Sequence, residues 1–311
     1  MALSNTDKKS NYGLDSSGFK QFLGSEFSSS KEQALFHIIP APMELSVSYG
    51  TGTAGGPAAI IEASQQLEKW DGYSVPGDKG IFTKNTAVLA EDKKPDVEYF
   101  LEFLEQETAD SLESGHIPVI LGGEHTVSLA AFRAICRSDL QFKGRTGILH
   151  FDAHADLRDE YEGSRLSHAC VMRRGFELGL PIFQIGVRSL SLPEIAFRKE
   201  NNISFIDARD AVTGNISSIT LPEDFPENIY ISIDIDGFDP SIFPATGTPE
   251  PGGLGWYQVL SIIESAADMR KIIGFDVVEL APLKLPGFHA SDFAAARLVY
   301  NVMGIIERGR L

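Results

Sequence analysis

Apolar runs alternate with amphipathic stretches along most of this chain of 311 residues. Short runs rich in Ile, Val, Leu and Phe predict buried strands at 35–39, 117–122, 146–152, 182–187, 229–235 and 271–279. Apolar residues three or four positions apart predict helices at 57–67, 97–114, 126–136, 257–268 and 291–309. Such alternation is typical of a parallel sheet covered by helices, so the expected fold class is α/β.

The beginning of the chain follows a different pattern. Residues 1–33 are polar and rich in Ser, without the basic stretch and apolar run of a signal peptide. We expect them to form an arm over the surface or a subunit contact, and residues 34–311 to form a single domain. The sequence contains no uninterrupted run of about 18 apolar residues, so no membrane span is predicted. The two cysteines, Cys136 and Cys170, do not make a disulfide framework, which favours the cytoplasm.

The net charge narrows the class of partner. Lys and Arg total 27 against 43 Asp and Glu, which gives a formal charge of −16. This balance argues against nucleic acids and anionic membranes as partners, and it is compatible with a cationic substrate. Solubility alone accounts for most of the charge, so this observation does not identify a ligand.

Three metal-binding side chains stand at every second position from the end of the strand predicted at 146–152. Asp152, His154 and Asp156 therefore point to one face of an extended chain. A buried strand has no structural use for two carboxylates and an imidazole side by side, because buried carboxylates are costly unless they are paired or bound to metal. The pattern indicates a metal site.

Two more predicted strands end in side chains of the same kind. Asp234 and Asp236 follow the apolar run 229–233, and His125 comes just after the apolar run 117–120. Sites in parallel α/β sheets form outside the carboxyl ends of the strands, so these three groups can converge on one place. His125 alone would be interpreted as a buried core histidine; the other two motifs make it a candidate ligand.

These motifs resemble the three signatures of the ureohydrolase family, which includes arginase, agmatinase and related amidinohydrolases. The matching segments are Gly-Gly-Glu-His at 122–125, Asp-Ala-His-Ala-Asp at 152–156 and Ser-Ile-Asp-Ile-Asp-Gly-Phe-Asp-Pro at 232–240. The resemblance implies a three-layer α/β/α fold with a central, mostly parallel sheet of about eight strands. It also implies two Mn²⁺ ions at the carboxyl edge of that sheet, and assembly as a homotrimer or homohexamer.

The resemblance implies a role for each candidate residue. Asp152 and Asp234 would bridge the two ions, and the other four ligands would form two pairs, His125 with Asp156 and His154 with Asp236. Ligation by oxygen and imidazole without thiolate favours Mn²⁺, although Co²⁺, Ni²⁺ and Zn²⁺ stay open. A water held between two metals is acidified to hydroxide, which would attack the guanidinium carbon.

Two residues outside the ligand set complete the expected reaction. His168 matches the family's proton donor to the leaving amine, and an imidazole suits proton transfer near neutral pH. Glu279 matches the family's guanidinium-binding glutamate, and a carboxylate is the natural partner of that planar cation. Asp156 is counted with these two as catalytic. Glu124 stands where many family members have Asp, and we expect it to support the ligands rather than bind metal.

The choice of substrate depends on the loop after the first metal motif. Arg158 replaces an Asn, and Ser191 an Asp, that arginases use for the amino-acid end of arginine. The loop 158–163 is otherwise acidic, which suits the terminal amine of agmatine, so we expect hydrolysis of agmatine to putrescine and urea. Arg158 could instead hold the carboxylate of a guanidino acid or of formiminoglutamate. Arginine and guanidine also stay open.

Two other classes of protein compete with this interpretation. A deacetylase of the same broad fold would need one catalytic zinc and paired histidines, whereas the two aspartate motifs favour two metals. A metal-binding regulator without turnover is disfavoured, because all six candidate ligands, His168 and Glu279 are present.

Overall fold

The computed structural model describes residues 20–85, 96–137, 142, 144–283 and 289–309. Within these residues one eight-stranded sheet forms the centre of the protein, and its neighbouring strands pair in parallel. Its strands are β1 (Phe36–Ala41), β2 (Ile81–Thr83), β3 (Ile117–Gly122), β4 (Thr146–Phe151), β5 (Ile182–Ile185), β6 (Ser204–Ile206), β7 (Asn228–Asp234) and β8 (Lys271–Val278). The order across the sheet is β2-β1-β3-β8-β7-β4-β5-β6.

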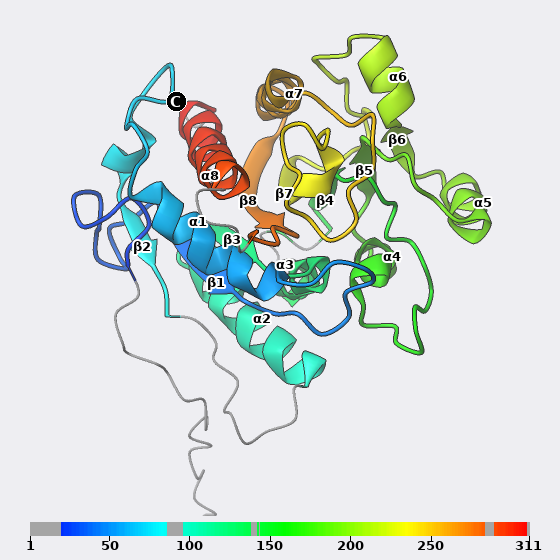
Figure 1. Ribbon diagram of the computed structural model, residues 1–311, viewed down its shortest axis with the longest axis horizontal. Helices are drawn as coiled ribbons and strands as arrows, with labels where there is room; N and C mark the ends of the chain where they lie inside the picture. Colours follow the sequence, from blue (N-terminus) through cyan, green and yellow to red (C-terminus); the bar gives the residue numbers. More distant parts are fainter. Residues whose placement is uncertain (1–19, 86–95, 138–141, 143, 284–288, 310–311) are drawn as a thin grey trace, which may run out of the picture.

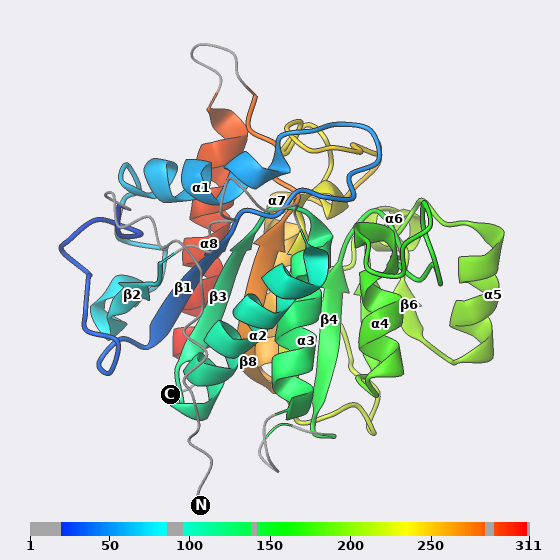
Figure 2. The ribbon, with the colours of Figure 1, turned by 90° about the horizontal axis from the view of Figure 1, so that it is seen from below.

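Helices cover both faces of this sheet, as Figures 1 and 2 show. One layer contains α2 (Val97–Glu113), α3 (Ser128–Arg137) and α4 (Val171–Glu177), and the opposite layer contains α1 (Gly56–Ser64), α7 (Trp256–Ala267) and α8 (Ala290–Arg308). Two further helices lie beside the β6 edge, α5 (Leu192–Glu200) and α6 (Ala208–Thr213). The expected three-layer α/β/α architecture is confirmed. None of these described helices is long and apolar enough to cross a membrane.

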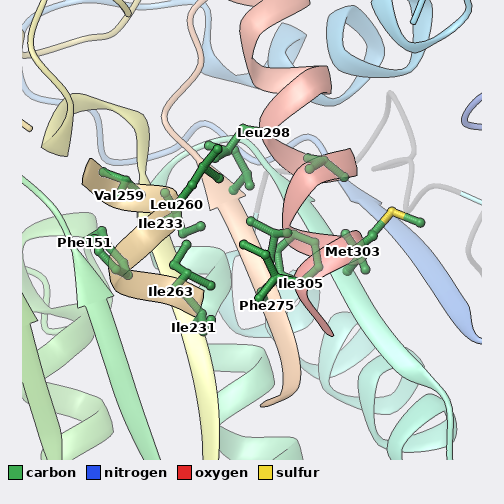
Figure 3. Packing of buried hydrophobic residues seen from close by; sticks show 14 of the residues in the cluster. Phe151, Ile231, Ile233, Val259, Leu260, Ile263, Phe275, Leu298, Met303 and Ile305 are labelled. Carbon is green, nitrogen blue, oxygen red and sulfur yellow. The ribbon is translucent and has the colours of Figure 1, made fainter. Parts of the chain in front are cut away.

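The hydrophobic core is divided by the sheet into two clusters, one on each face. Figure 3 shows the first, in which Ile231, Ile233 and Phe275 of the sheet pack against Ile263 of α7 and Leu298 of α8. All five side chains are fully buried. A sheet covered on both faces needs strands that are apolar on both faces, which is why the strands appear in the sequence as continuous apolar runs.

The six predicted strands are all present, and the two that the sequence pattern missed lie at the edges of the sheet. β2 and β6 have three residues each, too few to reveal a period, and no residue of β6 is buried. The missed helices are also short, from six to nine residues. α5 carried a detectable signal, because Ser191 and Glu194 form a capping box at its start.

The first described residues pack against the domain. Phe22 is fully buried and Phe27 nearly so, and both belong to the core cluster that contains α8. Ser28 also forms an isolated parallel bridge with Ile81 of β2. Residues 1–19 of the expected arm lie outside the described residues.

The strand order brings the candidate site residues together at the centre of one edge of the sheet. The four central strands are β3, β8, β7 and β4. His125 follows β3, Glu279 follows β8, Asp234 ends β7 and Asp152 follows β4. Because all strands run in one direction, these residues emerge at the same edge from four adjacent strands.

Gly123 allows the loop after β1 to pack directly on the end of β3. A Cβ atom at this position would lie 2.0 Å from the Met43 carbonyl oxygen. Backbone hydrogen bonds fix the contact, since the Gly123 N–H donates to Ala41 and the Glu124 N–H donates to Met43. The absence of a side chain at Gly123 therefore allows this loop to lie close to Glu124, the residue before His125.

We expect Gly123→Ala to lower the free energy of unfolding by about 3 kcal/mol, because the backbone of the loop must move to admit the methyl group. Gly309→Ala is the matched control, since its Cβ would lie no closer than 3.5 Å to any atom and its φ of −68° is open to any residue. That control should change stability by no more than about 0.5 kcal/mol. Guanidinium unfolding measures both variants, and equal stabilities would contradict this account of Gly123.

Candidate metal centre

The six candidate ligands form two groups of side chains that share Asp152. In the first, His125 Nδ1 lies 3.1 Å from Asp152 Oδ2, 3.0 Å from Asp156 Oδ2 and 3.5 Å from Asp234 Oδ2. In the second, His154 Nδ1 lies 3.1 Å from Asp236 Oδ2 and 3.5 Å from Asp152 Oδ1. These distances leave room for ions coordinated by several side chains at once.

Backbone N–H groups hold one oxygen of three of these carboxylates. Asp152 Oδ1 accepts from the His154 N–H, Asp234 Oδ1 from the Asp236 N–H, and Asp236 Oδ1 from the Ala153 N–H. The other oxygen of Asp234 and of Asp236 is directed toward an imidazole. The carboxylates are therefore oriented before any metal ion binds.

A hydrogen-bonded chain sets the orientation of His125. Ser232 Oγ donates to Asp276 Oδ1 at 2.8 Å, so it accepts from His125 Nε2 at 2.9 Å. With its proton on Nε2, the neutral ring turns the lone pair of Nδ1 toward the three carboxylates. This buried Nδ1 has no hydrogen-bond partner among the described residues. A lone pair and several carboxylate oxygens around one point are what a divalent cation requires.

The pKa shifts within the cluster also indicate that it requires a cation. Burial, together with the charge of Asp152, raises the pKa of Asp156 to about 7. Burial and the neighbouring Asp236 raise the pKa of Asp234 well above its usual range. Although burial opposes it, hydrogen bonds to Asp152 and Asp236 raise the pKa of His154 to about 12. Several carboxylates cannot stay ionised together here unless positive charge is supplied, and metal ions would supply it.

His150 is a supporting residue that the sequence did not reveal. Arg198 Nε donates to Gln184 Oε1, so the Gln184 amide nitrogen faces His150 Nδ1 at 3.0 Å and the Ala155 carbonyl at 2.7 Å. His150 Nδ1 must then accept, and its Nε2–H donates to Asp152 Oδ2 at 2.8 Å. His150 therefore orients Asp152 and is not itself a ligand. The only signal in the sequence was its position two residues before Asp152, on the same strand face.

Two residues of the site have left-handed backbone, which is costly for side chains other than Gly. The φ angles are 53° at Asp156 and 64° at Glu279, a conformation that costs about 1–3 kcal/mol. Glu279 is held in place on both sides, since its N–H donates to Gly123 and its Oε1 accepts from the His125 N–H at 2.7 Å. Such strain is typical of functional positions.

Two connected cavities lie over the ligands. The inner one, about 20 Å³, is lined by five of the candidate ligands together with His168 and Glu279, and the outer one measures about 210 Å³. Ser48, His154, Asp156, His168 and Thr248 line both, so the inner cavity opens into the outer one. The structure thus brings His168 and Glu279 to the candidate metal ligands. It places Arg158 in the outer cavity only.

The acidic side chains of the loop 158–163 do not line the outer cavity. The loop contributes Arg158 and Tyr161 to its lining, with the Arg158 guanidinium 5.4 Å from the centre of the Tyr161 ring. Asp159 instead forms ion pairs with Arg165 and Arg174. The loop carboxylates that the sequence suggested for binding a substrate amine therefore do not line this cavity.

Comparison with known proteins agrees with this geometry. A model of the arginase family matches residues 34–304. The chain belongs to the arginase family. It is 38% identical to the N(1)-aminopropylagmatine ureohydrolase of Synechocystis, over 93% of this chain and 94% of that protein. It is 32% identical to the agmatinase of Pyrococcus horikoshii, over 89% of this chain and 94% of that one.

Solved structures agree with the sequence relatives. The agmatine ureohydrolase of Thermoplasma volcanium superposes with a TM-score of 0.78 at 30% identity, covering 94% of this chain and 95% of the other. The arginase of Medicago truncatula gives a TM-score of 0.78 at 27% identity, covering 88% of each chain. This chain is therefore an arginase-family ureohydrolase, similar to proteins named agmatinase and aminopropylagmatine ureohydrolase.

Replacing the shared carboxylate should disrupt both groups of ligands at once. After loading with Mn²⁺ and dialysis, we expect Asp152→Asn to retain much less metal than the unmodified protein, because a neutral amide weakens both positions. Asp159→Asn removes a carboxylate from the exposed loop nearby and should keep the metal content of the unmodified protein. Metal analysis of dialysed protein measures both variants. Full metal content in Asp152→Asn would contradict the shared site.

Proposed function

We propose that this protein hydrolyses the guanidinium group of agmatine to putrescine and urea at a centre of two Mn²⁺ ions. The observation that carries the proposal is the pair of ligand groups sharing Asp152, directly below a small cavity lined by His168 and Glu279. A hydrolase of this family needs a site for metal, a partner for the guanidinium and a proton donor for the leaving amine, and each has a candidate residue here.

The ligand set suits two hard divalent ions. Four carboxylates carry about −4 when ionised, and two such ions bring +4, so the buried cluster becomes nearly neutral. Oxygen and imidazole ligands without thiolate favour Mn²⁺. When bound, the pair of ions would supply the Lewis acidity that makes hydroxide available near neutral pH.

The side chains of the inner cavity would bind the substrate and move its protons. Glu279 faces the cavity with one oxygen fixed by the His125 N–H, and its carboxylate would pair with the planar guanidinium cation. His168 lines the same cavity and would give a proton to the departing amine, since an amine leaves far more readily when it is protonated.

The outer cavity would hold the rest of the substrate. Tyr161 offers an aromatic face to an ammonium group, and Ser189 and Ser191 offer hydroxyl oxygens. The second candidate substrate is N(1)-aminopropylagmatine, because the Synechocystis relative is named for it and because the outer cavity is much larger than the inner one. Both candidates end in an amine and require the same chemistry.

We also expect the 33.9 kDa subunits to assemble as a trimer or hexamer.

The substrate is tested by urea release from Mn²⁺-loaded protein, run in parallel on agmatine, N(1)-aminopropylagmatine, arginine, guanidinobutyrate, formiminoglutamate and guanidine. Formamide release replaces the urea assay for formiminoglutamate. We expect the two amine-ended compounds to exceed those with a carboxylate in kcat/KM by about 100-fold or more, because a desolvated mismatched charge costs about 3 kcal/mol. They should also exceed guanidine, which has no tail to occupy the outer cavity. Preference for a substrate with a carboxylate would contradict the proposed specificity.

A substitution of Arg158 tests the proposed specificity, because the proposal fixes the direction in which the KM for agmatine should change. We expect Arg158→Gln to leave the KM for agmatine unchanged or lower, because it removes a positive charge from the cavity that receives an ammonium group. Arg165→Gln is the control, since Arg165 pairs with Asp159 and Glu177 and does not line this cavity. A KM for agmatine that rises about tenfold in Arg158→Gln alone would show that Arg158 assists substrate binding.

A further inference from the structure

The His168 ring is held at both nitrogens by serines from the loop that follows β1. Ser48 Oγ lies 2.8 Å from Nε2, and Ser46 Oγ lies 3.2 Å from Nδ1. Ser46 Oγ also accepts the His168 backbone N–H at 3.2 Å. A third hydroxyl, that of the adjacent Ser167, lies 3.3 Å from Nδ1. Ser46 and Ser48 are more than 100 positions from His168 in the chain.

The protons of both loop hydroxyls are directed to other acceptors. Ser46 Oγ donates to Glu124 Oε1 at 2.8 Å, which is shorter than its contact with the ring. Ser48 Oγ donates to the Tyr161 hydroxyl at 3.0 Å. Each serine therefore presents a lone pair to His168. A ring protonated on both nitrogens satisfies both contacts, and a neutral ring satisfies one.

Glu124 anchors this loop from the end of β3. Its carboxylate is fully buried and accepts four hydrogen bonds, from the N–H groups of Leu45 and Ser46 and from the hydroxyls of Ser46 and Thr126. Four donors saturate a carboxylate, so Glu124 is fully engaged in holding the loop. These contacts give Glu124 a structural role.

The remainder of the loop is fixed as well. Glu44 accepts the backbone N–H groups of Gly52 and Ala54, and the Gly50 N–H donates to Gly247. A Cβ atom at Gly50 would lie 2.8 Å from Gly247 Cα, so the two loops touch over the site. The serines are thus held on a rigid segment, as a positioning role requires.

We propose that Ser46 and Ser48 are positioning residues for His168, which hold its ring by both nitrogens over the inner cavity while Glu124 fixes their loop. This inference rests on the proposed function, in which His168 is the proton donor. Burial lowers the pKa of His168, and hydrogen bonds to two acceptor oxygens oppose this shift by favouring the protonated ring, the form that can give a proton to a leaving amine. Neither serine needs to contact the reacting atoms.

The kinetic test uses Mn²⁺-loaded protein and agmatine. We expect Ser46→Ala and Ser48→Ala each to lower kcat about tenfold or more, with KM within about threefold, because the loss affects proton donation rather than binding. Ser48→Thr keeps the hydroxyl and should recover most of the lost kcat. Ser167→Ala, which removes the hydroxyl that has no link to Glu124, should lower kcat by no more than about threefold.

A double variant separates positioning from general damage. If the serines act through His168, adding Ser48→Ala to His168→Ala should cost no more than about twofold beyond His168→Ala alone. A full multiplicative loss would overturn the proposal, as would equal effects of Ser46→Ala and Ser167→Ala. Ser48 is exposed, so its variant should fold even if Ser46→Ala does not.

A readout independent of turnover is the rate at which diethyl pyrocarbonate acylates His168, located by mass spectrometry. We expect Ser48→Ala to raise this rate severalfold, because the reagent attacks the nitrogen that Ser48 engages. An unchanged rate would overturn the proposal even if urea release were normal. Conversely, a raised rate in a protein whose His168→Ala variant keeps full activity would support the contacts and reject His168 as the proton donor.

Discussion

The structure depends on one constraint, the burial of several carboxylates at the centre of a hydrophobic sheet edge. Asp152 lies in both candidate ligand groups and is fully buried. Removing ionised carboxylates from water is costly unless opposite charge is supplied. The apolar strands on either side, which stabilise the fold, are also what excludes water here. Stability and metal affinity therefore arise from the same arrangement, and positive charge at this site would stabilise the fold as well as serve the reaction.

Polar side chains behind the candidate ligands determine how the ligand atoms are oriented. Ser232 and Asp276 turn the lone pair of His125 toward the carboxylates, and Gln184 directs the Nε2–H of His150 to Asp152. These supporting groups are buried within the sheet, where their partners cannot be exchanged for water. The ligands are thus held in a fixed geometry before the metal binds, which is how a rigid α/β scaffold tunes a site formed at its strand ends.

Much of the fold, and the residues that form the candidate ligand groups, could be predicted from the sequence, because both depend on short segments of the chain. The central strands are continuous apolar runs, and the aspartates alternate directly at their ends. β2 and β6 could not be predicted, because three-residue edge strands carry no measurable period. His150 and the serines around His168 depend on tertiary contacts between distant segments. The acidic loop suggested a partner for an amine, but Asp159 pairs with Arg174 instead, a choice that local composition does not reveal.

The central claim is that the two ligand groups sharing Asp152 form one dinuclear centre. The most direct measurement is anomalous diffraction at the manganese edge from crystals grown with Mn²⁺. The account predicts two peaks of similar height on either side of Asp152, one beside His125 Nδ1 and the other beside His154 Nδ1, with His150 outside the coordination of both. A single peak, or a metal bound to His150 Nε2, would contradict it.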